Sequence, residues 1–284
     1  MRSSIGVMAL SVLVWACQKM NSVNSMHNMK EQSYNREIAL SVYKDVIGRR
    51  DTARAGEIIA ENYIQHNPQI KTGRAGVMEA IEYLKNMPAP PTGGPSPIRR
   101  VIVDGNFVVL HLVVDIMGKC KYVVDLFRVE NGLLAEHWDA IQDEAVDVGD
   151  TPSMIDGPTA IEDHELTDVN KEVVRAFAEH VLEARDYGRL SGLVSDALVQ
   201  HDPQIGQGLR ALRDFLGSDT SLRWRKVHRI IGEGGLVLIQ SEVLMDEKPF
   251  VRYDLFRLSD RKIVEQWSVQ QAIPEVMMHN NGMI

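Results

Sequence analysis

The chain has 284 residues, enough for one large domain or two of ordinary size, and its 44% hydrophobic content is enough for real cores. The net charge is −8, and acidic and basic residues are interspersed without a long basic run, which argues against nucleic acid as a partner. The two cysteines, Cys17 and Cys120, exclude by count a disulfide framework and a cysteine-based metal site.

The first 17 residues have the pattern of an export signal. Arg2 precedes an apolar run of about a dozen residues, the length of a signal-peptide core and too short to span a bilayer as a stable helix. The run ends in Leu-Val-Trp-Ala-Cys17, which resembles a bacterial lipobox, although Trp15 is an unusual occupant of its place. We expect lipidation at Cys17, a flexible tether over residues 18–32, and an exported lipoprotein of the bacterial cell envelope held at the membrane by its lipid anchor. A plain secretory signal and an apolar leader on a cytosolic chain are the alternatives.

Helices precede strands in the pattern that follows. Apolar spacing predicts a helix from Tyr34, a second helix that includes Ile58, Ile59 and Tyr63 and ends near Asn67, because Pro68 disfavours helix there, and a third over 75–85. After a proline-rich loop at 87–97, β-type runs occupy 98–103, 107–116 and 121–129, and a fourth strand returns through 139. Helices first and antiparallel strands after predict the α+β class.

The last two of these strands form a hairpin with Asn131-Gly132 at its turn, where both residues tolerate positive φ. A two-residue loop at 131–132 places Asp125 and Asp139 on opposite faces. A three-residue loop at 130–132 with Gly132 left-handed pairs Asp125 with His137, and then Asp125, His137 and Asp139 share one face with Trp138 on the reverse. We favour the three-residue loop.

The second half of the chain repeats the first. Residues 200–208 match residues 65–73 at an offset of 135, and six of the nine are identical. Asp254-Leu-Phe-Arg257 and Gln271 match Asp125-Leu-Phe-Arg128 and Gln142 at an offset of 129, and the proline-rich loop accounts for the difference. We therefore expect two tandem domains, 33–155 and 168–284, joined by a polar linker at 156–167.

Each repeat resembles the SnoaL-like branch of the nuclear-transport-factor-2-like superfamily, and within it the group named for predicted aldol-condensation activity. The motifs that carry the resemblance are Tyr63-Ile-Gln-His-Asn-Pro68, Val124 to Gly132, and Glu136-His-Trp-Asp139 with Gln142. It covers nearly everything after residue 33. The resemblance implies a cone, in which a curved antiparallel sheet wraps round helices and encloses a cavity. It also implies a cavity aspartate as general acid/base, with no metal and no organic cofactor. Members of the superfamily include enzymes, ligand binders and interaction domains, so the fold does not settle the function.

The resemblance and the hairpin together nominate site residues. Asp139 is the candidate general base, with Asp125 and His137 as its catalytic partners, because clustered titratable groups in an apolar pocket have shifted pKa values. The candidate substrate-binding residues are Tyr63, His66, Asn67 and His111. Structural alternatives stand beside each role: a backbone-bonded aspartate at a strand end, a salt-bridged Asp125, a helix-capping His66 and a satisfied core His111. The other alternative is a zinc site formed by His66, His111, His137 and Asp139. We do not expect such a site, because no tight two-histidine motif occurs.

The second copy differs at these positions. His137, Asp139 and His111 correspond to Gln266, Ser268 and Gln240, which do not exchange protons near neutral pH. We expect the first domain to be the active or ligand-binding one and the second to be degenerate, the two packing as an intramolecular pseudo-dimer.

Two functions are open at this stage. In one, the first domain binds a small apolar carbonyl compound and catalyses cofactor-free aldol-type cyclisation or isomerisation. In the other, the chain is a non-enzymatic ligand-binding or scaffold lipoprotein.

Overall fold

A computed structural model of the chain describes residues 28–87, 95–116, 118–145, 151–218 and 222–284. The expected signal segment with Cys17, and the tether up to residue 27, lie outside these residues. The remainder of the expected tether, 28–32, is not a tether, because it begins an α-helix that runs through residue 41. Within the described part of the chain, no helix combines the length and apolar character needed to cross a membrane.

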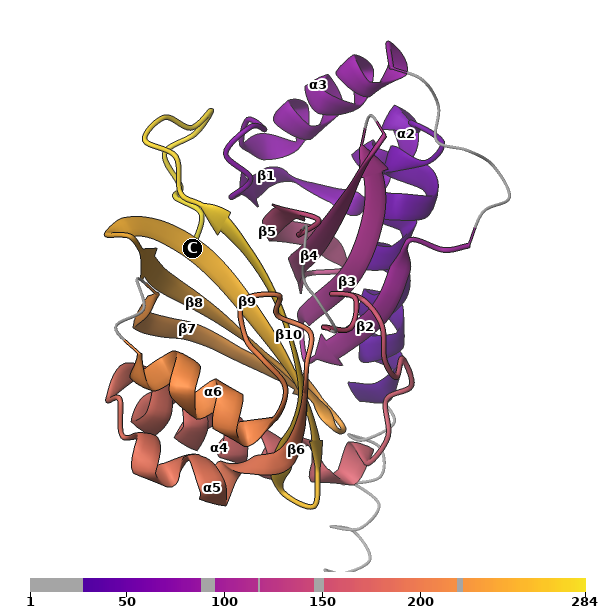
Figure 1. Cartoon of the computed structure of the whole chain (residues 1–284). Helices are drawn as coiled ribbons and strands as arrows, with labels where there is room; N and C mark the ends of the chain where they lie inside the picture. The colour runs from indigo at the N-terminus through magenta and orange to yellow at the C-terminus, as the bar shows by residue number, and fades with distance from the viewer. Residues whose placement is uncertain (1–27, 88–94, 117, 146–150, 219–221) are drawn as a thin grey trace, which may run out of the picture.

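The first domain, residues 28–145, folds a five-stranded sheet against helices (Figure 1). Its first helix continues as a π-helical turn, η1 (Val42–Ile47), and two helices follow, α2 (Thr52–Ile58) and α3 (Gly73–Lys85). The strands are β1 (Ile59–Gln65), β2 (Ile98–Asp104), β3 (Phe107–Ile116), β4 (Lys119–Glu130) and β5 (Leu133–Asp143), in the sheet order β1-β5-β4-β3-β2.

One predicted helix is in large part a strand. The second helix, expected to reach Asn67, ends at Ile58, and β1 then runs parallel to β5 with Gln65 beside His137. Short apolar runs fit both a helix and a strand by spacing alone. Here the free edge of β5 supplies hydrogen-bond partners to the main chain of residues 59–65, so these residues form a strand rather than a helix.

The second domain, residues 164–272, repeats this plan. Its helical elements are η2 (His164–Leu166), α4 (Thr167–Ala176), the π-helical η3 (Phe177–Glu183), η4 (Tyr187–Arg189), α5 (Leu190–Leu193) and α6 (Gly208–Gly217). Its strands are β6 (Val194–Gln200), β7 (Arg223–Glu233), β8 (Leu236–Met245), β9 (Lys248–Ser259) and β10 (Lys262–Ala272), in the order β6-β10-β9-β8-β7. As in the first domain, the second helix that the repeat predicts is mostly strand here, because β6 takes its place. The predicted α+β class and tandem arrangement are confirmed.

The two sheets pack against each other, and the helices lie on their outer sides (Figure 1). Leu126 and Trp138 of the first sheet share one hydrophobic cluster with Tyr253 and Trp267 of the second. Each sheet also forms one hydrophobic cluster with its own helices. Arg229 stacks 4.1 Å from the Trp138 ring, and Arg100, 129 residues earlier, stacks 4.1 Å from the Trp267 ring. The contact between the sheets therefore has approximate two-fold symmetry within one chain.

A segment after each domain reaches the other domain. After the first, residues 151–158 place the Ser153 carbonyl 2.7 Å from His201 Nδ1, and the Asp156 carbonyl accepts from Trp267 Nε1. After the second, the segment Met278–Gly282, within the yellow end of the chain in Figure 1, lies against the first domain beside β1. Met154 and Met283 are both buried in the cluster between the sheets.

Candidate functional site

Asp125, His137 and Asp139 lie together on the helix-facing side of the first sheet. Asp125 pairs across the ladder with Asp139, and Phe127 pairs with His137. All three acid/base side chains are buried.

The hairpin reaches this arrangement by a different route from the one expected. The three-residue loop is wrong: Glu130 pairs with Leu133 around a two-residue turn, with φ of 52° at Asn131 and 74° at Gly132. Val129 then pairs with Leu134 but Arg128 with Glu136, so Ala135 is the extra residue of a β-bulge. The bulge shifts the register by one residue, and this brings Asp125 to the face of Asp139, as predicted.

A chain of hydrogen bonds connects His137 to Tyr43 in the π-helical turn η1. The Tyr43 hydroxyl donates to Asp125 Oδ2 at 2.5 Å, and Asp125 Oδ1 lies 3.1 Å from His137 Nε2. On the other side of the ring, Nδ1 lies 2.9 Å from Gln65 Oε1. That oxygen already accepts from the main-chain N–H groups of residues 66 and 67, so His137 must carry a proton on Nδ1. Nε2 is therefore the nitrogen that titrates, and it faces a carboxylate.

Asp139 is only half satisfied. Its Oδ2 accepts from the Asn67 side-chain amide at 2.6 Å, but its Oδ1 has no hydrogen-bond partner among the described residues and no exposure. Burial raises the pKa of Asp139 to about 6; the charge of Asp125 adds to the rise, and His137 and Asn67 oppose it. Burial alone would lower the pKa of His137, but the hydrogen bond and charge of Asp125 and the charge of Asp139 outweigh it and raise that pKa.

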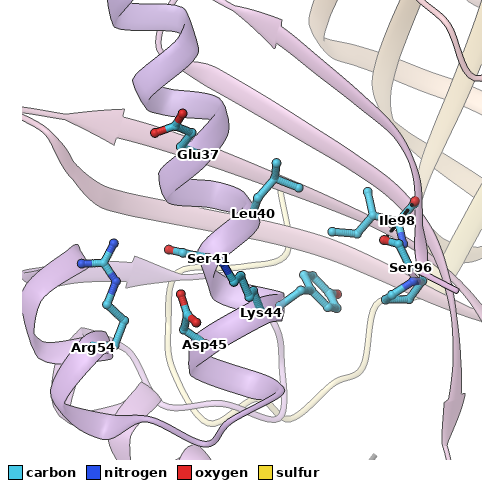
Figure 2. A pocket seen from close by; sticks show the side chains of 10 residues that line it. Glu37, Leu40, Ser41, Lys44, Asp45, Arg54, Ser96 and Ile98 are labelled. Atoms are coloured by element: carbon cyan, nitrogen blue, oxygen red, sulfur yellow. Dashed lines mark hydrogen bonds between the residues drawn. The ribbon is translucent and has the colours of Figure 1, made fainter. Parts of the chain in front are cut away.

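Tyr43 also borders the pocket drawn in Figure 2, whose volume is about 550 Å³. The first helix and the segment entering β2 form its walls, with Leu40 and Ile98 facing each other across it in Figure 2. Its lining residues are Glu37, Leu40, Ser41, Tyr43, Lys44, Asp45, Arg54, Ser96, Pro97 and Ile98. Tyr43 is thus shared by an open pocket and the buried cluster.

Of the predicted substrate-binding residues, two lie at the cluster. Asn67 bonds Asp139 directly. Tyr63 is buried in the same interior, where burial and then the charges of Asp125 and Asp139 raise its pKa well above the usual value.

His66, a predicted substrate-binding residue, does not lie at the cluster but on the other side of β5. Its Nε2 lies 2.9 Å from Glu136, its Nδ1 lies 2.8 Å from the Gly282 carbonyl, and its ring stacks on Trp138. His201 repeats all three contacts with Glu265, Ser153 and Trp267. An arrangement present in both copies at the contact between the domains is structural.

His111, the fourth predicted substrate-binding residue, also lies away from the cluster. It points into the contact between the sheets, with Nδ1 3.2 Å from Arg100 and its ring edge-on to Trp267. Burial, followed by the charge of Arg100, lowers the pKa of His111 to about 3. It is therefore a neutral core histidine, but not the fully satisfied one of the structural alternative, because its Nε2 has no hydrogen-bond partner among the described residues.

Two residues of the cluster were not among the candidates. Gln65 stands just before His66 and is repeated as Gln200, a signal that was present in the sequence. Tyr43 gave no such signal, because the residue 135 positions on is Ala178.

A metal ion would find three donors here. One ligand atom each from Asp125, His137 and Asp139 lies within 4.8 Å of the others, and Gln65 leaves Nε2 of His137 as the coordinating nitrogen. Two carboxylates and a neutral imidazole suit a divalent cation, but the cation would have to replace the bond between His137 and Asp125.

The second domain neutralises its corresponding cluster. Arg252, at the position of Val123, donates to Asp254 at 2.8 Å and to Asp202 at 2.6 Å. Asp202 stands where the first domain has Asn67, and it also accepts from Ser268, at the position of Asp139. Burial opposes the charge on Arg252, but both carboxylates raise its pKa above the usual value. This buried ion pair gives a physical basis for the predicted degeneracy of the second copy.

Residues 41–137 match the family model of the SnoaL-like domain. The first domain is a SnoaL-like domain. The matched range includes Tyr43, Gln65, Asn67, Asp125 and His137, and it ends two residues before Asp139. A comparison with curated protein sequences finds no match.

Solved structures with a similar fold include a LEH-like epoxide hydrolase from M. tuberculosis, with 20% identity over 37% of this chain and 84% of that one and a TM-score of 0.33. A SnoaL-like polyketide cyclase from Agrobacterium tumefaciens shares 17% identity over 36% of this chain and 91% of that one, with a TM-score of 0.31. These values are too low to say anything about the ligand or reaction of the SnoaL-like domain.

Proposed function

We propose that the SnoaL-like domain binds a small, mainly apolar carbonyl compound and catalyses a cofactor-free acid/base step on it, with Asp139 as the base. The single observation that carries this proposal is the buried Oδ1 of Asp139, which has no partner among the described residues. Leaving a buried carboxylate oxygen unpaired costs stability, and an oxygen without a partner is free to accept a proton from a substrate.

Its acidity suits the role. With a pKa of about 6, Asp139 is mostly ionised near neutral pH yet binds a proton readily when one is delivered. In the proposed step a C–H bond next to the carbonyl breaks, the proton goes to Asp139 Oδ1, and the electron pair moves to the carbonyl oxygen. The enolate carbon then attacks a second carbonyl of the same molecule, and the resulting alkoxide takes the proton back from Asp139.

Access is through the pocket of Figure 2. Tyr43 lines the pocket and donates its hydrogen bond to Asp125 of the cluster, so the substrate must displace its side chain or take over that hydrogen bond. The apolar residues of the pocket, Leu40, Pro97 and Ile98, suit an apolar substrate body.

The test is deuterium uptake at the α-carbon of a panel of enolisable diketones, followed by NMR in D₂O. We expect uptake to rise with pH through about 6 and then level off, and Asp139→Asn to slow it by roughly a hundredfold or more. Ser268→Ala, the matched change in the second domain, should leave the rate unchanged. Equal rates for Asp139→Asn and the wild type would refute Asp139 as the base, and loss of the rate on chelation would point to a metal site instead.

A second candidate is a non-enzymatic ligand-binding or scaffold protein. The observation that favours it is the dense pairing of Tyr43, Asp125 and His137, which leaves these groups satisfied without a ligand. Binding of apolar ketones without any deuterium uptake would support it.

We further propose, from the sequence alone, that the chain is anchored to the cell envelope through lipidated Cys17. Radiolabelled palmitate should enter the wild-type chain expressed in bacteria but not a Cys17→Ser variant. Labelling of both would contradict the proposal.

A further inference from the structure

The segment Met278–Gly282, which follows the second domain, is hydrogen-bonded to one loop of the first. The Met278 N–H donates to the Pro68 carbonyl at 2.9 Å, and His279 Nε2 lies 2.9 Å from the Asn67 carbonyl. The Asn281 amide donates to the Gln65 carbonyl at 2.9 Å and to Thr72 Oγ1 at 3.0 Å. The Gly282 carbonyl lies 2.8 Å from His66 Nδ1.

That loop, residues 65–68, orients the candidate site. Gln65 fixes the proton on Nδ1 of His137, and Asn67 holds Oδ2 of Asp139. The segment bonds the main chain of the two residues whose side chains touch the titrating groups. A shift of the loop therefore moves both groups.

In the equivalent loop of the second domain, the main chain of Gln200 is held from within the domain, although the Ser153 carbonyl also contacts His201 there. There Gln207 accepts from the Gln200 N–H at 3.0 Å and donates to the Gln200 carbonyl at 2.8 Å. The first domain has the shorter Thr72 at that position, which accepts from the Gln65 N–H but leaves the Gln65 carbonyl to Asn281. In the segment after the first domain, the residue matching Asn281 is Pro152, which has no side-chain donor. The added support is thus specific to the domain that carries Asp139.

We propose that His279 and Asn281, in the segment that follows the second domain, are positioning residues for the site of the SnoaL-like domain, and that carrying this segment is one role of the degenerate copy. The inference rests on the proposed function for its catalytic meaning, but not for its structural test. Neither residue touches the reacting atoms, and both act through Gln65 and Asn67.

The experiment uses the full chain with a His279→Ala/Asn281→Ala double variant. Its rescue adds Thr72→Gln, which supplies the side chain that Gln207 provides in the second domain. The control is Asn280→Ala, an exposed neighbour on the same segment. The readouts are the pKa of Asp139 from carboxyl NMR and deuterium uptake by the diketone panel.

We expect the double variant to raise the pKa of Asp139 above about 6, because Asn67 no longer holds its charged form. Deuterium uptake should fall roughly tenfold to a hundredfold. Thr72→Gln should restore both, and Asn280→Ala should change neither. An unchanged pKa of Asp139 in the double variant would overturn the inference. A shifted pKa without any uptake in the wild type would keep the inference and reject the proposed enzymatic function.

Discussion

At the scale of single residues, the first domain keeps a carboxylate where the second keeps a hydroxyl. Asp139 is buried with one oxygen unpaired, whereas Ser268 is satisfied by Asp202. The second domain neutralises its two acids with Arg252, and the first has Val123 in that place. The difference between the copies is therefore a difference between a titratable site and a permanent ion pair.

The ionised side chain of Asp139 should lower the free energy of unfolding above about pH 6. A folded-state pKa raised from 3.8 to about 6 means that the folded protein binds the proton more tightly than the unfolded chain. The free energy of unfolding therefore falls between these pH values and stays lower above them. Asp139→Asn should raise the free energy of unfolding at pH 8 by about 2–3 kcal/mol, with a gain that vanishes below about pH 4, measured by urea denaturation.

A suitable control is Asp143→Asn, because Asp143 is on the same strand but exposed and paired with Lys121, and it should show no such gain. If Asp139→Asn destabilised the protein at every pH, Asp139 would be a structural acceptor.

At the scale of elements, the hairpin of β4 and β5 decides which side chains meet. Its two-residue turn and the bulge at Ala135 together set the register that pairs Asp125 with Asp139. Either feature alone would place the two carboxylates on opposite faces of the sheet, because neighbouring residues of a strand alternate.

Gly132 is required at the turn because its φ is 74°. Gly132→Ala should destabilise the fold by about 1–2 kcal/mol, the usual penalty for a side chain in the left-handed region. The nearest atom to an added Cβ is 3.7 Å away, so the loss is conformational rather than steric. Gly192→Ala in α5, where nothing lies within 4 Å of the added Cβ, should be neutral or stabilising by up to about 1 kcal/mol in the same thermal melts. Equal losses in both variants would contradict the role of the turn.

At the scale of the whole molecule, the two domains share a core. Trp138 and Trp267 are both almost fully buried in the cluster between the sheets, and a segment after each domain is bonded to the other. Neither sheet has a solvent-adapted face on that side. We infer that the domains depend on each other for stability.

Calorimetry should then show one cooperative unfolding transition, and Trp267→Ala should lower the stability of both domains by about 3–5 kcal/mol. We also expect a monomer near the chain mass of 31.9 kDa in sedimentation, because the symmetric partner is within the chain. Two separated transitions, or a dimeric mass, would contradict this prediction.

The sequence predicted the shared face of Asp125, His137 and Asp139 through a three-residue loop that is wrong, and the bulge at Ala135 produces that face instead. The sequence by itself determined the α+β class, the two copies, and the strands over 98–103 and 107–116. These follow from local signals: the alternation of strand residues, the Asn-Gly turn and the internal repeat. Only the tertiary structure decided that residues 59–65 form a strand, that His66 and His111 face the other sheet, and that Tyr43 and Asn281 act on the site. Those outcomes depend on contacts such as Gln65 with His137, Tyr43 with Asp125 and Asn281 with Gln65, whose partners are 72, 82 and 216 positions apart. Contacts at such separation leave no periodicity in the sequence.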